Sequence, residues 1–336
     1  MALQVAQPAR STRLARSCRI AFCVAALLFA NRGWAADSAG PLRSCLRGTC
    51  FDDTQDCPKK EEEPKLSFGP CDCQPRKTLM QWSYGTSFSG GPPGMDEPLA
   101  SDRPDFTEAS VTVGRGVAQV EMGYTFTTDK SGGQRTIEHS FPEMLWRVGL
   151  FAEWLEFRIA YNHGANDVAL NGAPVSSASG AEDLYLGLKI GLTPQEGILP
   201  EMAIVPQMTV PSGGRDFTAD EVLPGVNWLY GWDINDFLSA GGSTQVNRAN
   251  DGAGNFYAEF AQSLTFGYTL TEKLGAYTEW FVFIPHGDTT AQSEHYFNGG
   301  FAYHVTNNLQ FDVRAGLGLN EAADDFFTGV GAVVRF

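Results

Sequence analysis

The C-terminal part of the chain is dominated by alternation of apolar and polar residues with a period of two. In the stretch 309–320, every second residue from Leu309 to Leu319 is apolar, while Gln310, Asp312 and Arg314 lie between them. Successive side chains of a strand point to opposite faces, so the pattern predicts strands with one apolar and one polar face. Soluble sheets have strands of about five or six residues, whereas a tilted strand needs ~9–11 to cross hydrocarbon.

About twelve such segments follow one another. They lie near residues 116–127, 143–150, 155–162, 182–192, 201–210, 224–232, 237–246, 256–270, 274–284, 296–305, 309–320 and 326–336. Short turns alternate with longer polar loops at 128–142, 163–181, 211–223, 247–255 and 285–295. We predict an all-β fold: a membrane-spanning, antiparallel up-and-down β-barrel of about twelve strands, as in outer membranes. The alternative is a soluble β-sandwich or jelly roll, but glycines on the polar face favour a curved lumen.

The N-terminus predicts export. Residues 1–35 contain five arginines and no acidic residue, and an apolar stretch, Ile20–Ala30, is followed by Gly33-Trp34-Ala35-Ala36. This is the pattern of a signal peptide; the alternative is an uncleaved membrane anchor, for which the stretch is too short to span a bilayer. A formal net charge of -15 argues against a nucleic-acid partner.

Five cysteines cluster in one short region. They are Cys45, Cys50, Cys57, Cys71 and Cys73. In an exported protein such clustering predicts disulfides, although their pairing cannot be deduced and an odd number leaves one thiol over. Paired CxxC spacing and nearby histidine are both missing from the sequence there, which argues against zinc. Charge, proline and glycine are frequent, so residues 36–107 are predicted to be a low-order periplasmic linker or small module, and 108–336 the barrel.

Charged residues of the strands are predicted to point into the lumen, because an ionised Arg or Lys facing hydrocarbon at mid-depth costs about 2–4 kcal/mol. The predicted pore-lining residues are Glu121, Arg147, Glu156, Arg158, Asp183, Lys189, Glu259, Glu279, His304, Asp312, Arg314 and Arg335. We favour a water-filled path whose charges tune selectivity over an ion-pair network that fills the barrel. Asp102, Arg103 and Asp105 are expected to form a solvated lead-in, the alternative being that they enter the periplasmic mouth and pair with lumenal charges.

No catalytic site is predicted. The five histidines lie mostly in predicted loops or inward positions, and the sequence contains no G-x-S-x-G nucleophile motif. Metal-ligand spacing, a phosphate-binding loop and a dinucleotide fingerprint are missing from the sequence as well. We therefore expect neither an enzyme nor a bound cofactor or metal.

The chain ends on an alternating strand that closes with Phe336. A terminal aromatic strand resembles the signal that the barrel-assembly machinery recognises in outer-membrane proteins. It predicts that this machinery and outer-membrane lipid are partners of the chain.

Several segments resemble the outer-membrane transporter family associated with meta-pathway phenol degradation. They are Ser101–Glu108, Pro142-Glu143 with Arg147, Leu155–Arg158, Asp183–Lys189, Val210–Gly213, and Leu317–Asn320 with Asp324–Phe327. The resemblance covers about residues 101–336 and implies a twelve-strand type of barrel, without implying a solute. We expect a channel for passive passage of small solutes, with aromatic or hydrophobic compounds among them. The alternative is a structural or adhesive barrel with a blocked lumen and a partner-binding Cys-rich segment.

Overall fold

The computed structural model describes residues 75–82, 90–251 and 254–336. The predicted signal peptide and the five clustered cysteines lie outside these residues. Among the described residues, no helix is long and apolar enough to cross a membrane. The strands are β1 (Ala118–Ser131), β2 (Gln134–Ser140), β3 (Met144–Gly149), β4 (Leu155–Tyr161), β5 (His163–Leu170), β6 (Ala173–Ala181), β7 (Leu184–Thr193), β8 (Glu201–Val210), β9 (Leu223–Asp233), β10 (Leu238–Asn250), β11 (Phe256–Thr269), β12 (Leu274–His286), β13 (Glu294–Thr306), β14 (Leu309–Gly318) and β15 (Phe326–Arg335).

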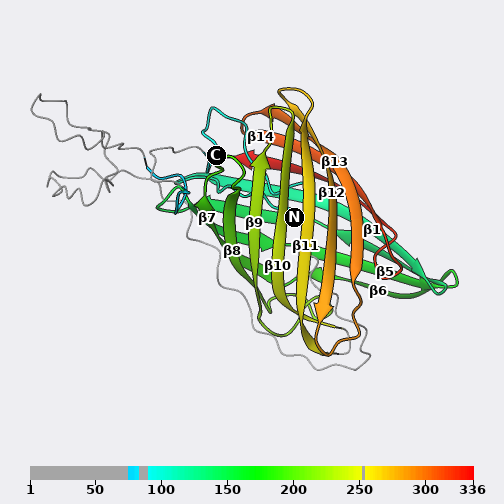
Figure 1. Cartoon of the computed structure of the whole chain (residues 1–336). Coiled ribbons are helices and arrows are strands. Elements are labelled where there is room, and N and C mark those ends of the chain that lie inside the picture. Colours follow the sequence, from blue (N-terminus) through cyan, green and yellow to red (C-terminus); the bar gives the residue numbers. More distant parts are fainter. Residues whose placement is uncertain (1–74, 83–89, 252–253) are drawn as a thin grey trace, which may run out of the picture. The chain divides into compact units, whose positions relative to one another are not determined.

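The sheet closes on itself. The last strand, β15, pairs antiparallel with β1 from Gln119 opposite Arg335 to Thr128 opposite Phe326. β1 pairs with both β2 and β3. On their other side, β2 pairs with β5 and β3 pairs with β4. The strands β2 and β3 therefore act as one interrupted strand. In the same way, β4 and β5 together form one interrupted strand, and β6 and β7 form another. The fifteen strands therefore form a closed antiparallel barrel of twelve, which confirms the predicted fold class (Figure 1).

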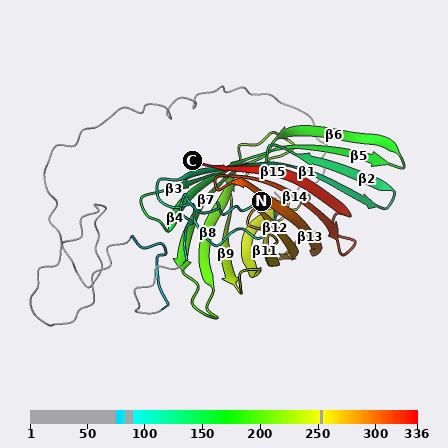
Figure 2. The same ribbon diagram turned by 90° about the horizontal axis from the view of Figure 1, so that it is seen from above.

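The two stretches predicted as long polar loops, 128–142 and 163–181, are largely strand. They form the outer end of β1 and the strands β2, β5 and β6, which extend past the other strands (Figure 2). The prediction of loops was wrong there because the period-two signal needs one apolar face. A hairpin that extends beyond the barrel has no hydrocarbon on either side, so neither of its faces needs to be continuously apolar.

Side chains alternate between the two sides of the barrel wall as the pattern predicts. In β14, Phe311 is 51% exposed, whereas the next residue, Asp312, is 6% exposed. The apolar residue therefore faces outward and the charged residue faces the enclosed interior. The buried residues of the strands accordingly include many charged ones, such as Glu121, Arg147 and Glu279, which a soluble sandwich does not place in its core.

Candidate functional site in the barrel lumen

The residues that precede β1 enter the barrel. We call Leu99–Val113 the lumenal segment; within it Leu99, Asp102, Arg103, Phe106 and Thr107 are all buried. The expectation of a solvated lead-in was therefore wrong, and the boundary predicted at residues 107 and 108 falls inside this segment. Its charged side chains can be buried because the barrel wall presents opposite charges to them.

Asp102 is the centre of the largest ion-pair cluster. Its carboxylate accepts hydrogen bonds from Arg158 and from Lys189, the latter at 2.8 Å, and lies 3.4 Å from Arg147 Nη1. Arg147 of β3 and Arg158 of β4 are directly opposite each other in the sheet register. Two like charges in that position repel, so a fixed anion between them stabilises this part of the wall.

Two further carboxylates complete the cluster from the wall. Glu156 accepts hydrogen bonds from Arg147 at 2.8 and 3.0 Å and from the Val113 backbone N–H at 2.8 Å. Glu121 accepts one from Arg147 at 3.1 Å and one from the Asp102 backbone N–H. The wall therefore binds both side chains and main chain of the lumenal segment.

Arg103 spans the seam where the barrel closes. Its guanidinium donates to Glu143 at 3.0 Å, to Asp312 at 3.2 Å and to the Val330 carbonyl at 3.2 Å. Beneath it, Gly123 of β1 and Gly331 of β15 are paired partners. A Cβ added to Gly123 would lie 2.4 Å from the guanidinium, and one added to Gly331 would lie 2.2 Å from Nε. The two glycines therefore form a notch that the arginine fills.

Glu279 of β12 holds the next part of the lumenal segment. It accepts the backbone N–H groups of Phe106 and Thr107, both at 2.7 Å, and the Thr107 hydroxyl at 2.7 Å. Asn298 of β13 donates to the same carboxylate at 2.8 Å. Four hydrogen bonds to one ionisable group are a strong anchor for backbone that would otherwise be buried without partners.

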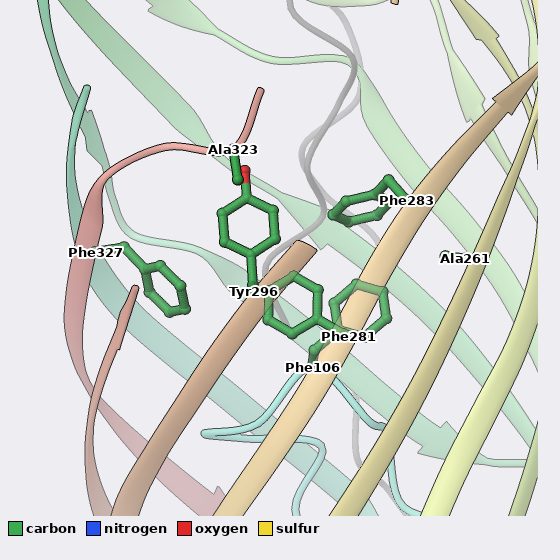
Figure 3. Packing of buried hydrophobic residues seen from close by; sticks show 7 residues of the cluster. All are labelled: Phe106, Ala261, Phe281, Phe283, Tyr296, Ala323 and Phe327. Carbon is green, nitrogen blue, oxygen red and sulfur yellow. The ribbon is translucent and has the colours of Figure 1, made fainter. Parts of the chain in front are cut away.

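An aromatic cluster lies inside the barrel around Phe106. Its ring stacks on Phe281 with centroids 4.6 Å apart and meets Phe283 edge-on at 5.4 Å. Tyr296 stacks on the other side of Phe281 at 4.8 Å, and Phe327 packs against Tyr296 at 6.0 Å. Figure 3 shows these rings from four different parts of the chain gathered together. The lumen thus has an apolar region beside the charged one.

Two predicted arginines bind backbone of the segments that precede β1. Arg314 donates to the Pro104 carbonyl at 3.1 Å and to the Thr125 hydroxyl at 2.9 Å. Arg335, at the end of the last strand, donates to the Glu97 carbonyl at 2.7 Å. Together with Asp312, which binds Arg103, they hold the chain from Glu97 to Pro104 against β1, β14 and β15.

The remaining predicted residues lie apart from these clusters. Asp183, between β6 and β7, accepts backbone N–H groups of Ser212, Gly213 and Ala219, and so organises a loop. Glu259 accepts the Tyr257 hydroxyl at 3.2 Å. His304 is half-buried near the end of β13. These three are therefore not brought into contact with the lumenal segment by any hydrogen bond or ion pair described above.

Some residues of the site escaped the sequence prediction. Asp102 and Arg103 were expected in a solvated lead-in, with entry into the barrel mouth as the alternative. Glu108, which pairs with Arg158, was not predicted, and glycines such as Gly331 were taken only as features of a curved wall. The available signal was the stretch Ser101–Glu108, which carries four charged residues although it continues a segment with the composition of a linker. Its net negative charge is opposite in sign to Arg147, Arg158 and Lys189 on the facing strands.

Outside the membrane-spanning strands, acidic loop residues are perturbed. Burial raises the pKa of Asp324, between β14 and β15, to about 7, and the neighbouring carboxylates Glu138, Asp129 and Asp325 raise it further in the same direction. Asp251 behaves oppositely: backbone N–H groups of Thr290 and Asn255 lower the pKa of its carboxyl. These loops therefore respond to pH differently.

The chain is similar to several solved structures. The COG4313 outer membrane channel from Pseudomonas putida F1 is 14% identical, with a TM-score of 0.51, covering 70% of this chain and 99% of that one. The translocator domain of the autotransporter NalP from Neisseria meningitidis is 14% identical, with a TM-score of 0.44, covering 66% of this chain and 89% of that one. No curated protein sequence matches the chain significantly. The first structure shares the barrel fold.

The family comparison covers the barrel together with the lumenal segment. A family model described as "Putative MetA-pathway of phenol degradation" matches residues 101–336, a range that starts within the lumenal segment. The matched range therefore includes the ion-pair cluster, the Arg103 notch and every barrel strand. This twelve-strand barrel with its lumenal segment belongs to that family.

Proposed function

We propose that the protein is an outer-membrane channel for passive passage of small solutes, in which the lumenal segment narrows the path. The observation that carries this proposal is the way in which the segment is held. Asp102, Arg103 and the backbone of Phe106 are bound to the wall by ion pairs and hydrogen bonds. Polar contacts of this kind can be replaced by contacts with water, ions or a polar solute. The apolar contacts of a hydrophobic plug could be replaced only at a larger cost in free energy.

The two parts of the lumen suggest which solutes pass. Arg147, Arg158 and Lys189 present cationic groups to the interior from three neighbouring strands. Phe281 and Phe283 belong to the aromatic cluster, where a ring can stack face to face or edge-on. We infer that the path suits small molecules with an aromatic or hydrophobic part and a negatively charged group that takes the place of the Asp102 carboxylate, which pairs with all three cations. No energy source or cofactor is needed for such movement.

A second function is favoured by one observation. Asp102 is completely buried and surrounded by three cations, as in a permanently filled lumen. The alternative is therefore a structural or adhesive barrel that conducts nothing and whose Cys-rich segment, residues 36–107, binds a periplasmic partner. The two functions differ in whether the contacts of the lumenal segment ever open.

Single-channel recording of the purified full chain in planar bilayers separates the two. A channel gives stepwise ion current in the wild type and larger steps in Asp102→Ala, since that change removes the central anion of the cluster. An unchanged, silent barrel in both proteins, with the heat-modifiable gel mobility of a folded barrel, would establish the blocked alternative. Arg135→Ala, on the outer hairpin of β2, is the matched control and should leave the current as in the wild type.

We also infer that residues 1–35 are removed during export and that the cysteines of residues 36–107 form disulfides. The basic and apolar pattern of the N-terminus supports the first inference, and the oxidising periplasm supports the second. N-terminal sequencing of protein isolated from outer membranes tests the cleavage. Mass spectrometry of unreduced peptides tests the pairing.

A further inference from the structure

An open pocket of about 590 Å³ lies at one end of four neighbouring strands, β9 to β12. These strands run side by side in Figure 1. The pocket is lined by Pro224, Gly225, Val226, Val246, Asn247, Arg248, Phe256, Tyr257, Ala258, His286 and Gly287. None of these residues belongs to the lumenal ion-pair cluster or to the aromatic cluster described above.

The pocket opens on the outer face of the barrel wall. Val226, Val246 and Phe260 form one row of paired residues across β9, β10 and β11. Phe260 is 42% exposed, whereas Ala261 beside it is 2% exposed and belongs to the interior aromatic cluster. The row that includes Val246 therefore faces outward, toward lipid in a barrel that spans a membrane.

The hollow has a simple origin in the next row of the sheet. Arg248 of β10, Ala258 of β11 and His286 of β12 are paired in register. The middle member ends at a methyl group, while its two neighbours have long or broad side chains. Ala258 is therefore the floor of a notch whose walls are Arg248 and His286, with valines below.

Arg248 is held in place rather than free to swing. Its guanidinium lies over the Phe256 ring at 4.1 Å, and its Nη2 pairs with Glu221 at 2.8 Å. Its side chain remains 39% exposed. A guanidinium carries five N–H groups in a planar fork that matches a phosphate, and stacking on an aromatic ring fixes the plane of the fork.

Short periplasmic turns and longer external loops are typical of outer-membrane barrels, and this arrangement predicts that both barrel termini are periplasmic. The pocket then lies at the extracellular end. β1 then starts, and β15 ends, at the periplasm, and successive strands of the antiparallel barrel run in opposite directions. β10 and β12 therefore end, and β9 and β11 begin, on the external side. Arg248 then lies at the depth of the outer-leaflet headgroups, where an arginine costs far less free energy than at mid-depth.

We propose that this pocket binds a phosphorylated lipid of the outer leaflet, with one acyl chain on Ala258 and the valines and a headgroup phosphate on Arg248. The inference rests on the proposed outer-membrane location but not on conduction. Apolar lining beside a fixed cation is complementary to an anionic amphiphile, and the outward orientation makes lipid the molecule that covers it. Glu221 partly neutralises Arg248 and so limits the strength of the phosphate contact.

Retention of lipid by the purified full chain tests the proposal. Protein is reconstituted in nanodiscs of phosphatidylethanolamine doped with a phosphorylated outer-leaflet glycolipid or with the same lipid after removal of its phosphates. Bound lipid is then counted by native mass spectrometry after transfer to detergent. We expect the wild type to retain both forms, the phosphorylated one about tenfold more. Arg248→Gln should retain about tenfold less of the phosphorylated form, and Glu221→Gln should retain more of it. Inorganic phosphate at millimolar concentration should not displace the lipid.

A second variant probes the acyl-chain notch independently. Ala258→Phe fills the floor and should abolish retention of both lipid forms, whereas Arg248→Gln should affect the phosphorylated form alone. Lys130→Gln, on the exposed outer end of β1, is the matched control for loss of a surface cation. Equal retention in the wild type and Arg248→Gln overturns the proposal even if Ala258→Phe does not fold. Single-channel current unaffected by Arg248→Gln shows that the site is separate from the conducting path.

Discussion

Gly123 of β1 and Gly331 of β15 face each other across the seam that closes the barrel, and both lie directly under the guanidinium of Arg103. The seam joins the first and last strands of the chain, so it forms only when the whole sheet is complete. Arg103 binds Asp312 of β14 and Glu143 just before β3, on either side of that seam. The lumenal segment therefore stabilises closure as well as occupying the interior.

Gly331→Ala should displace Arg103. The added Cβ would lie 2.2 Å from Nε, a distance that requires the arginine or the strand to move. We expect a loss of roughly 1–3 kcal/mol of unfolding free energy, as for other overpacked sites, and a larger single-channel current. Urea unfolding in detergent and bilayer recording measure the two effects.

Gly275→Ala is the control for that substitution, because a Cβ there meets only a backbone oxygen at 3.8 Å. It should leave stability and current close to those of the wild type. If both variants behave alike, the notch under Arg103 has no special role.

Asp102→Asn should uncouple the lumenal segment from β3, β4 and β7. The change removes the negative charge from between Arg147, Arg158 and Lys189 and leaves three neighbouring buried cations with less compensation. Breaking a buried ion pair costs about 3–5 kcal/mol, so the midpoint of unfolding should fall markedly. The excess of positive charge should also shift the reversal potential toward anion preference in a salt gradient. Asp167→Asn, at an exposed position of β5, should change neither quantity.

The strands and their faces could be predicted from sequence because hydrocarbon imposes a rule on each residue. An outward residue such as Phe311 must be apolar, while an inward one such as Asp312 is free to be charged, and the alternation records this directly. The rule ceases where hydrocarbon ends. The outer end of β1 and the strands β2, β5 and β6 therefore have no such pattern, although they are as regular as the rest of the sheet.

The partners of the lumenal charges could not be predicted in the same way. Parity places Arg147 and Arg158 on the inner face, but it gives no information on what fills the space between them. The answer comes from Asp102, which lies outside any strand and reaches them only through the three-dimensional path of the chain. A segment without regular structure has no period, so its burial depends on tertiary contacts alone.

Phe106→Ala should loosen the lumenal segment at the aromatic cluster. Phe106 stacks on Phe281 and contacts Phe283, and its removal leaves a cavity beside both rings. Truncation of a buried phenylalanine costs about 3–5 kcal/mol when the site cannot collapse. We expect reduced stability and more frequent open steps, measured by unfolding and single-channel recording. Phe106→Leu should recover most of the stability, and a loss as large as that of the alanine variant would argue against packing as the cause.

The stability of the barrel should fall as pH rises because of Asp324. Its folded-state pKa is raised from 3.8 to about 7, chiefly by burial. Between these values the folded protein binds a proton that the unfolded chain has already released, so the free energy of unfolding decreases as pH increases through that window. Asp324→Asn removes the titrating group, and the variant should be more stable than the wild type at pH 8 by roughly 1–3 kcal/mol. Thermal unfolding from pH 4 to 8 gives the pH dependence of stability for the wild type and for Asp324→Asn. Asp288→Asn, in an exposed loop, is the control. Parallel pH dependences for the wild type and Asp324→Asn would mean that Asp324 is not the group that takes up the proton.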